Sequence, residues 1–421
     1  MTSSTHSTEV AGARQSYAEG ALPTFTPIPW SLNEIRAAIP QHLFTRQTWR
    51  VLLYVARDLI MAGFFLRSAL RIDSFYGGEH VVEHLTVVGA QIARLMTWLL
   101  YWLLQGLIFT GIWVIGHECG HTALSGNKHI CNIVGYIAHT ILLTPYFSWK
   151  ITHHRHHIAH ASMERDQLFV PRTRSDLGIP SKGQQLDYED YFGDTPLYAL
   201  TVLIVQQLLA FPVCLACNIS GQKNYPRWTN HFNPNCVLFM KNQRSLIIIS
   251  DLGILFMMYI LKRTYEAWGA TTTFKVYGVP WFCVSHWLAM ITYLHHTDPE
   301  LPHYRRAQWN FQRGAAATMD RNFLGYIGRF FFHDVAHFHV VHHFFPKIPF
   351  YHAEEATRYL QAFIGEHYRY SDKPVFEAFW HNVNECKFIE DEARSAQGQS
   401  CIRGTGGRPE RAGMYTSVVD R

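Results

Sequence analysis

The sequence is poor in charge and in cysteine, and its start lacks an apolar segment. Charged residues make up 16% of the 421 residues while 48% are hydrophobic. A soluble globular domain has about 25% charged residues, so the missing charge implies long uncharged stretches. Eight cysteines are too few for the disulfide framework of a secreted protein. The first 24 residues contain Glu9 and Glu19 and no apolar core, which argues against a secretory signal or a transit peptide. This composition excludes a disordered protein, and a net charge of only +5 excludes a simple nucleic-acid binder.

Long uncharged stretches are indeed present, and they predict membrane spans. Residues 95–115 carry no charge, and residues 276–294 carry only His286 as a possible one. Both are close to the ~20 residues that cross a bilayer core. Residues 51–69 contain the adjacent Arg57 and Asp58, and residues 245–261 contain Asp251, but both are long enough to cross with adjustment.

Histidine is abundant, at 26 residues, and it is concentrated in three boxes beside the predicted spans. Each box spaces its histidines three or four residues apart, which puts their imidazoles on one face of a helix. The eight boxed residues are His117 and His121, then His153, His156 and His157, then His339, His342 and His343. Neutral imidazole suits Fe, Zn, Cu or Ni, so the boxes predict a metal site without naming the metal.

The first box also matches H-E-x-x-H, the zinc metalloprotease signature, in which Glu118 would act as general base. A single zinc would leave most of the boxed histidines unused, whereas two metals would use all eight. A histidine-rich metal transporter is a further alternative, although its ligands should lie within the spans and not at their ends. Eight imidazoles at the mouth of a membrane bundle favour oxygen activation against a lipid chain over hydrolysis.

Several motifs around the boxes point to one family. They are residues 39–42 (IPQH), 110–115 (TGIWVI), 145–150 (PYFSWK), 164–166 (ERD), 291–294 (ITYL), 301–304 (LPHY) and 348–357 (IPFYHAEEAT). With these motifs, residues 25–390 resemble the membrane-bound fatty acyl desaturases, specifically the oleate Δ12-type (omega-6) and omega-3 branch. The resemblance implies an oxidoreductase of lipid metabolism that uses O2 and a non-haem diiron centre to introduce a double bond into a lipid-linked acyl chain, at the Δ12 position of oleoyl chains.

The resemblance also implies the residues and partners of the site. The boxed histidines would bind two irons, and His296 aligns with an additional family histidine that would be a ninth ligand, whereas His295 would not bind. Glu118, Asp166 and Asp334 would support the ligands from behind. Electrons would come from separate cytochrome b5 and its NADH-dependent reductase, because no His-Pro-Gly-Gly haem segment and no flavin fingerprint is present.

Some positions depart from the oleate pattern. Gly116 stands in place of Ala, Thr122 in place of His, His154 in place of Arg, Phe338 in place of Thr and Asp298 in place of His. Hydroxylases, acetylenases, epoxygenases and omega-3 desaturases of this branch share the boxes, so the product stays open between these reactions.

The boxes must face one compartment, and this requirement limits the topology. An even number of spans must separate them, so residues 130–149 cannot cross the membrane. Of the candidates between the second box and His296, residues 197–217 contain Gln206, Gln207 and Pro212, and we expect them to be peripheral.

The sequence therefore predicts an all-α membrane protein with four transmembrane helices in two hairpins, a cytosolic histidine-rich cap and peripheral helices. The spans are 51–69, 95–115, 245–261 and 276–294 within a desaturase domain of residues 25–392, flanked by disordered tails at 1–24 and 393–421. Both termini would be cytosolic, and family resemblance favours the endoplasmic reticulum membrane.

Overall fold

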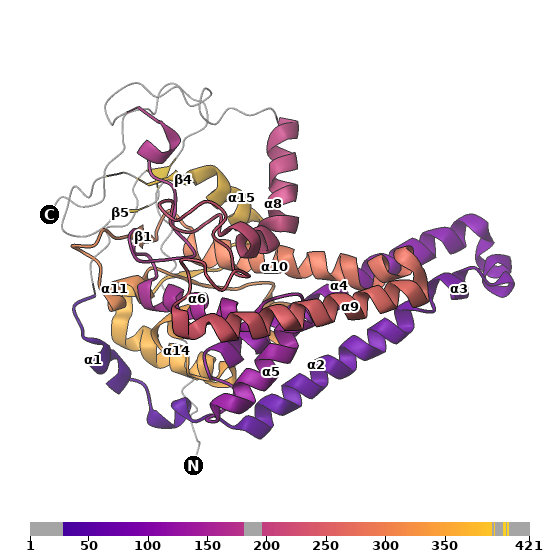
Figure 1. The fold of residues 1–421 in the computed structure, drawn as a ribbon, viewed down its shortest axis with the longest axis horizontal. Coiled ribbons are helices and arrows are strands. Elements are labelled where there is room, and N and C mark those ends of the chain that lie inside the picture. The colour runs from indigo at the N-terminus through magenta and orange to yellow at the C-terminus, as the bar shows by residue number, and fades with distance from the viewer. Residues whose placement is uncertain (1–27, 181–195, 390, 392–398, 401, 404–421) are drawn as a thin grey trace, which may run out of the picture.

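The computed structural model describes residues 28–180, 196–389, 391, 399–400 and 402–403 (Figure 1). The α-helices are α1 (Leu32–Ala37), α2 (Thr48–Ala69), α3 (Ile72–Tyr76), α4 (Glu79–Gly120), α5 (Lys128–Thr140), α6 (Tyr146–Ala159), α8 (Pro196–Cys217), α9 (Arg244–Thr273), α10 (Val279–His296), α11 (Phe311–Ala316), α12 (Gly325–Phe331), α13 (His339–Phe344), α14 (Phe350–Ile364) and α15 (Val375–Glu385). Short helical turns are η1 (Gln41–Phe44), η2 (Ser175–Leu177), η3 (Lys241–Gln243), η4 (Phe274–Gly278) and η5 (Gly365–His367). The strands are β1 (Pro302–His303), β2 (Asp320–Arg321), β3 (Tyr370–Ser371), β4 (Cys386–Phe388), β5 (Gln399–Ser400) and β6 (Ile402–Arg403). They pair as β1 with β5 and β4 with β6, both antiparallel, and β2 with β3 in parallel. The predicted mainly helical class is confirmed.

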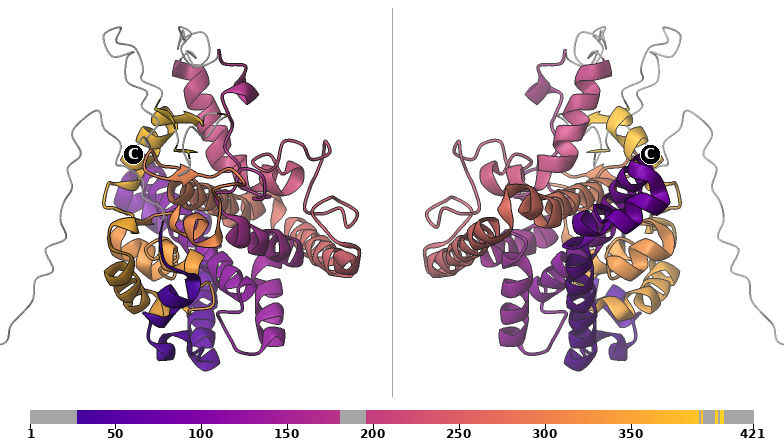
Figure 2. Two further views of the ribbon diagram at one scale, coloured as in Figure 1. Left: turned by 90° about the vertical axis from the view of Figure 1, so that its left-hand side faces the viewer. Right: turned by 90° about the vertical axis from the view of Figure 1, so that its right-hand side faces the viewer.

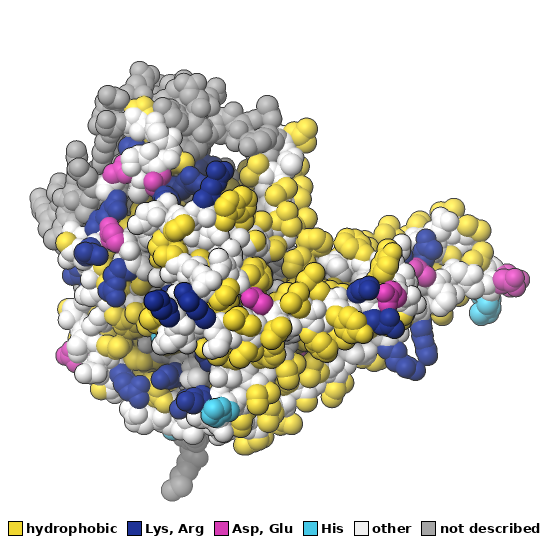
Figure 3. Space-filling view, in the orientation of Figure 1, with side chains coloured by type: hydrophobic (Ala, Val, Ile, Leu, Met, Phe, Trp, Pro, Cys, Tyr) yellow, Lys and Arg dark blue, Asp and Glu magenta, His cyan; other side chains and the backbone are white. Residues whose placement is uncertain are grey.

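Long helices form a stem that projects from one side of the molecule. Helices α2, α4 and α9 run along it in Figure 1, and α10 packs against α4. Their outer faces expose large apolar side chains such as Leu53, Phe64, Leu255 and Phe256, and Figure 3 shows the stem covered by hydrophobic side chains. Apolar surface on this scale is unfavourable in water and suits the lipid core of a bilayer. The stem is therefore the part of a membrane protein that lies in lipid.

Three stretches are long and apolar enough to cross a membrane: Glu79–Gly120, Leu200–Cys217 and Lys241–His296. The last stretch is a hairpin, because its backbone leaves the helical region at Gly269 (φ 78) and returns through η4 into α10. Thr86 (φ 62) interrupts α4 in the same way near its start. The predicted spans 95–115, 245–261 and 276–294 lie within these stretches, whereas the predicted span 51–69, on α2, is not among them.

Helix α8 is apolar but does not follow the stem. Its apolar stretch is only 6% buried, and it stands steeply across α4 and α9 in Figure 1 and apart from them in Figure 2. It contacts α10. Helix α8 therefore packs against α10 at an angle to the stem, and its apolar stretch, which we expected to be peripheral, is itself long enough to cross a membrane.

Residues 130–149, which parity forbids from spanning, belong to two short helices and not to one long one. Helix α5 ends at Thr140, and α6 begins after Pro145. Leu143 between them has a left-handed backbone (φ 56), which turns the chain. The second box on α6 can therefore lie on the same side of the membrane as the first.

The cap is the compact part of the molecule, and α14 supplies one side of its core. Ala353, Ala356, Leu360 and Ile364 recur at helical spacing and are buried together with Val340 of α13. Val341 and Phe344 of α13 belong to the same core. The other three residues of α13, which are the histidines of the third box, are therefore available to face away from it.

A strained turn connects the cap to the stem just before the third box. His333 (φ 49) and Asp334 (φ 59) both have left-handed backbones, which are unfavourable for residues other than glycine. His333 Nε2 donates a hydrogen bond of 2.7 Å to the buried Asp58 of α2, which also pairs with Arg57 at 2.8 Å. Asp334 pairs with Arg329 at 2.7 Å. The hydrogen bond from His333 to Asp58 and the ion pair between Asp334 and Arg329 hold the turn in place.

The predicted disordered tails, 1–24 and 393–421, lie outside the described residues apart from the short strands β5 and β6.

Candidate metal centre

The three boxes lie on helix ends that meet beneath the cap. His117 is in the last turn of α4, and His121 follows directly as its C-terminal cap. The second box occupies the second half of α6, and the third begins α13. Seven of the eight boxed imidazoles are buried and His153 is half-buried. The structure therefore brings together all eight histidines that the spacing selected.

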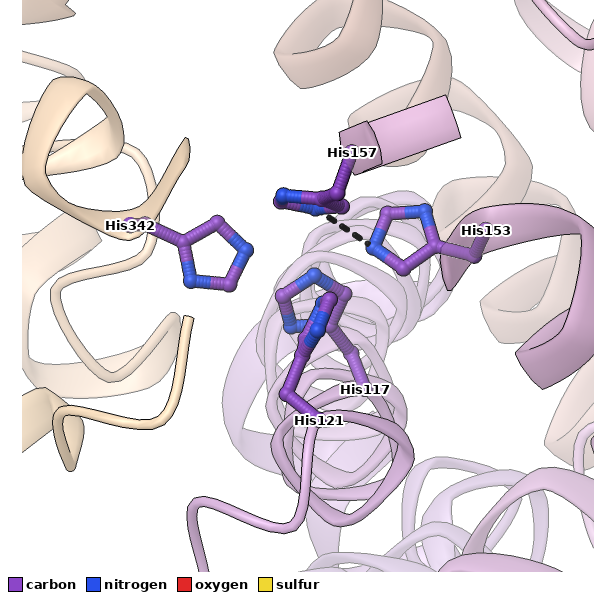
Figure 4. A group of neighbouring side chains, drawn as sticks. All are labelled: His117, His121, His153, His157 and His342. Carbon is purple, nitrogen blue, oxygen red and sulfur yellow. Dashed lines mark hydrogen bonds between the residues drawn. The ribbon is translucent and has the colours of Figure 1, made fainter. Parts of the chain in front are cut away.

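A first group of imidazoles combines all three boxes (Figure 4). One ring nitrogen of each member lies within 4.8 Å of those of the others, and the members are His117, His121, His153, His157 and His342. Figure 4 shows their rings arriving from the end of α4, from α6 and from α13 around one shared space. Nε2 of His153 lies 3.1 Å from Nε2 of His157.

A second group lies beside the first and includes residues outside the boxes. His296 at the end of α10 shares one set of neighbouring nitrogens with His156 and His160, and another with His339 and His343. Nε2 of His296 is 3.3 Å from Nε2 of His339. His296 thus belongs to both sets of this group, and it is the residue that the family resemblance implies as a ninth ligand.

The nitrogen spacing suits shared metal ions. Nitrogens that bind one ion at about 2.1 Å through roughly perpendicular bonds lie about 3 Å apart. The facing pairs at 3.1 Å and 3.3 Å have this separation. His339 Nδ1 donates to the Val335 carbonyl oxygen at 3.2 Å, which leaves its lone pair on the Nε2 that faces His296.

The protonation state of the rings also suits metal binding. Burial, reinforced by neighbouring imidazoles, holds the pKa of His153, His157 and His343 well below the usual range. The rings are therefore neutral, which is the form that binds metals. Buried ring nitrogens normally find a hydrogen-bond partner. Among the described residues of the two groups, such nitrogens without one are Nδ1 of His117, His157, His160 and His296, Nε2 of His121 and His342, and both nitrogens of His343. His139, His303, His333 and His337, which lie outside the groups, also have such nitrogens. The residues present fit two metal ions, one in each group.

Two of the predicted supporting carboxylates, Asp166 and Glu118, lie directly beside histidines of the two groups. Asp166 accepts a hydrogen bond of 2.8 Å from Nδ1 of His156, and ligating histidines typically make such a bond with their second nitrogen. Burial opposes ionisation of Asp166, but the imidazoles of His156 and His160 hold the pKa of its carboxyl below the usual range. An oxygen of Glu118 lies 3.3 Å from Nδ1 of His117 and 3.9 Å from Nδ1 of His342.

Asp334 differs from the other two carboxylates. Its ion pair with Arg329 continues to Glu354 on α14. It also lines a small pocket together with Glu118 and His342. Asp334 therefore shares a pocket with one member of the first group, His342, while its charge is balanced by Arg329.

Other supports were not singled out from the sequence. Asp320 of β2 accepts from the backbone N–H of Val340 at 2.7 Å and from the Tyr368 hydroxyl at 2.6 Å, which fixes the start of α13. The buried Arg321 donates to the Leu294 carbonyl at 2.7 Å and pairs with Asp298 at 2.8 Å. These contacts anchor both the third box and the end of α10, and no local spacing in the sequence reveals them.

His295, which is expected not to bind metal, packs its ring against that of His339, with centroids 4.6 Å apart, but directs both ring nitrogens at backbone carbonyls. Its Nδ1 lies 2.6 Å from the Ile291 carbonyl oxygen and its Nε2 lies 2.7 Å from the Ala336 carbonyl oxygen. Its neighbour His296 has Nε2 directed at His339. The two adjacent residues therefore face different surroundings, as residues one apart on a helix must.

Two of the departures from the oleate pattern have structural partners in this chain. A Cβ at Gly116 would lie 2.2 Å from the His139 ring, so this position has no room for Ala beside that histidine. Asp298, which stands where the pattern has His, pairs with the buried Arg321.

Comparison with known proteins agrees with this site. Residues 96–374 match the family model described as fatty acid desaturase, and residues 2–65 match one described as a domain of unknown function. The chain is 42% identical over 377 residues to a Delta(12) fatty acid desaturase of Mortierella alpina, covering 88% of this chain and 89% of that protein. The chain belongs to the fatty acid desaturase family. It is also 40% identical over 374 residues to an oleoyl-12-hydroxylase of Ricinus communis, covering 89% of this chain and 90% of that protein.

This desaturase is therefore an oxidoreductase, as predicted, and its histidine groups are compatible with a diiron site. The alternative zinc-protease interpretation of the first box is wrong. In this desaturase, His117 and His121 face three further imidazoles in one group, whereas a protease zinc site has three protein ligands and an open position.

Proposed function

We propose that this desaturase introduces a Δ12 double bond into oleoyl chains carried by membrane lipids. The observation that carries the proposal is the pair of adjacent imidazole groups in a chain that matches a Delta(12) fatty acid desaturase over most of its length. The proposed ligands of two irons are the nine predicted histidines, His117, His121, His153, His156, His157, His296, His339, His342 and His343.

The protein's part in the reaction is to hold the metal ions, to orient the acyl chain and to exclude water. The bound irons would supply the oxidising power, drawing on O2, two electrons and two protons, so that two hydrogens leave adjacent methylenes and O2 becomes two molecules of water. An unactivated methylene has no group on which acid or base catalysis could act. The protein therefore contributes the position of the substrate and the exclusion of water. Trp149 stacks on His153 at 4.4 Å and Trp113 packs against His117 at 6.0 Å, which places aromatic walls against the first group.

The proposed topology places both groups and both termini on the cytosolic side of the endoplasmic reticulum membrane. The four proposed spans, 51–69, 95–115, 245–261 and 276–294, would return the chain to the cap side at each box. Tags at Ser175 and at either terminus should be accessible from the cytosol, and a tag near Thr271 should be lumenal. A lumenal tag at Ser175 would contradict the shared site.

The proposed electron donors are cytochrome b5 and its NADH-dependent reductase, which act from the cytosol. Membranes containing the enzyme should form product with NADH only when cytochrome b5 is present. Equal activity with and without cytochrome b5 would contradict this partner.

The decisive experiment is expression in a host that makes oleoyl lipids but no polyunsaturated lipids, followed by mass spectrometry of the fatty acids. The expected product is two mass units lighter than oleate, with its new double bond at carbon 12. A His153→Ala variant expressed to the same level should form none. A host with unchanged fatty acids, despite a folded protein that holds iron, would contradict the proposal.

Hydroxylation at the same carbon is the second candidate, because the chain is almost as similar to an oleoyl-12-hydroxylase as to the desaturase. The same experiment separates the two outcomes, because a hydroxylated product is sixteen mass units heavier than oleate.

A further inference from the structure

His160 is a buried histidine that lies outside the box spacing. It caps the C-terminal end of α6, four residues after His156, and only 1% of its surface is exposed. Its ring centre lies 4.4 Å from that of His296, 4.7 Å from that of His343 and 5.0 Å from that of His156. His160 is thus surrounded by members of the second group.

The hydrogen bonding of His160 defines which ring nitrogen is free. Nε2 lies 3.0 Å from the Ala317 carbonyl oxygen. A carbonyl oxygen only accepts, so Nε2 carries the proton and Nδ1 keeps its lone pair. Nδ1 is buried and has no hydrogen-bond partner among the residues that the structure describes. The nearest carboxylate oxygen, on Asp166, is 3.9 Å away, beyond hydrogen-bond distance.

The neighbouring His156 is held in an equivalent way, with one ring nitrogen hydrogen-bonded and the other free. His156 donates its Nδ1 proton to Asp166 and so keeps a free Nε2, while His160 donates its Nε2 proton to Ala317 and so keeps a free Nδ1. Metal-binding histidines generally fix their second nitrogen by such a bond to a carboxylate or a backbone carbonyl.

His160 also makes the two groups equal in size. The first group has five imidazoles. The nine predicted ligands leave only four for the second, namely His156, His296, His339 and His343, and His160 would be the fifth. Its position is well fixed, because the Trp309 indole donates to its carbonyl at 2.9 Å and Gly314 packs so closely there that a Cβ would lie 2.4 Å from the same oxygen.

The geometry points to His160 as a tenth imidazole of the diiron centre, which binds the second iron through Nδ1. This inference rests on the proposed diiron function, and it adds a ligand that no box spacing predicts.

The test compares two substitutions of His160 in the full-length protein. His160→Gln keeps a donor near the position of Nε2, for the bond to Ala317, and removes Nδ1. His160→Asn places its amide near Nδ1 and gives up the bond to Ala317. His303→Gln is the matched control, because His303 is 2% exposed, lies near His160 and belongs to neither group.

Iron content after dialysis against graded chelator, and Mössbauer spectra of protein enriched in iron-57, are the measurements. We expect His160→Gln to hold the second iron at least about tenfold more weakly and to lose or shift one of two iron subspectra. His303→Gln should match the wild type in both measurements.

Two other outcomes would overturn the inference. If His160→Gln holds two irons with unchanged spectra while His160→Asn is impaired, His160 only holds the loop of Ala317. If both variants match the wild type, it has neither role. Failure of the underlying proposal is distinguishable, because then the wild-type protein itself would not hold two irons.

Discussion

In the first imidazole group, the rings are held mainly by packing against aromatic side chains. His153 stacks on Trp149 with ring centres 4.4 Å apart and planes at 19°, and His117 lies near-parallel to Trp113 at 6.0 Å. Glu118 is the nearby carboxylate, but its 3.3 Å approach to Nδ1 of His117 does not make a hydrogen bond.

In the second group, by contrast, oxygen acceptors orient three of the five rings, while His296 and His343 have no such acceptor among the described residues. The three donor and acceptor pairs are His156 with Asp166, His160 with Ala317 and His339 with Val335. Packing fixes the position of a ring but leaves its proton free to move between the two nitrogens. A hydrogen-bond acceptor fixes both the position of the ring and the nitrogen that carries the proton. The second metal should therefore depend on residues well outside the boxes, and the first mainly on the boxes themselves.

The largest expected effect is the loss of a first-group ligand. His121→Ala removes a member of the first group whose buried Nε2 has no hydrogen-bond partner among the described residues and is therefore available for metal. We expect product formation to fall at least about 100-fold, since even changes behind a ligand cost about 10 to 100-fold. The exposed His129 at the start of α5 provides the control, because His129→Ala should retain full activity. Activity of His121→Ala close to wild type would remove this group from the reaction.

The next effect tests the residue that joins the second group. His296→Ala should lower iron content towards one per chain and abolish product, because His296 is shared by both sets of nitrogens in that group. His295→Ala should keep most of both, since its nitrogens face backbone carbonyls. Elemental analysis and fatty-acid profiles measure the two properties. Equal tolerance of the two changes would place His296 outside the centre.

A smaller effect compares the two supporting carboxylates. Asp166→Asn weakens the acceptor that fixes the tautomer of His156, so the second iron should bind about 10 to 100-fold more weakly. Glu118→Gln should cost only severalfold, because no hydrogen bond joins Glu118 to a ligand ring. Iron retention against a chelator gives both values. A larger loss in Glu118→Gln would reverse the contrast between the groups.

The smallest effect concerns the turn that precedes the third box. Asp58→Asn replaces the carboxylate that accepts from His333, and loss of a buried hydrogen bond to a charged group costs about 1 to 3 kcal/mol. We expect a lower unfolding temperature and a severalfold loss of activity with two irons retained. Because α13 supplies proposed ligands to both groups, neither iron should be lost selectively. Asp251→Asn, on α9, should change neither quantity. A selective loss of one iron in Asp58→Asn would show that the turn serves only one group.

The sequence was sufficient for the parts of the site that depend on local spacing. Boxed histidines at intervals of three and four share a helix face wherever a helix forms, so their convergence could be predicted before the fold was known. The parity of the spans likewise predicted that residues 130–149 do not cross, and they form parts of α5 and α6.

The rest of the site depends on contacts between distant segments. Asp320 reaches Val340, and Arg321 reaches Leu294 and Asp298, only after β2, α10 and α13 have come together. Asp334 illustrates the same limit, because the sequence could not reveal that Arg329 would pair with it. His160 carried one local signal, its spacing of four from His156, but that spacing alone does not distinguish a ligand from a buried structural histidine.

The unpartnered ring nitrogens also bear on the life of the protein in the cell. A chain that has not received metal keeps neutral imidazoles buried without hydrogen-bond partners, and that state is less stable than the loaded one. Binding of metal therefore stabilises the folded cap relative to opened forms. Chains that emerge when iron is scarce would open more often and be removed by proteolysis, so the amount of this desaturase would follow the iron supply even at constant synthesis.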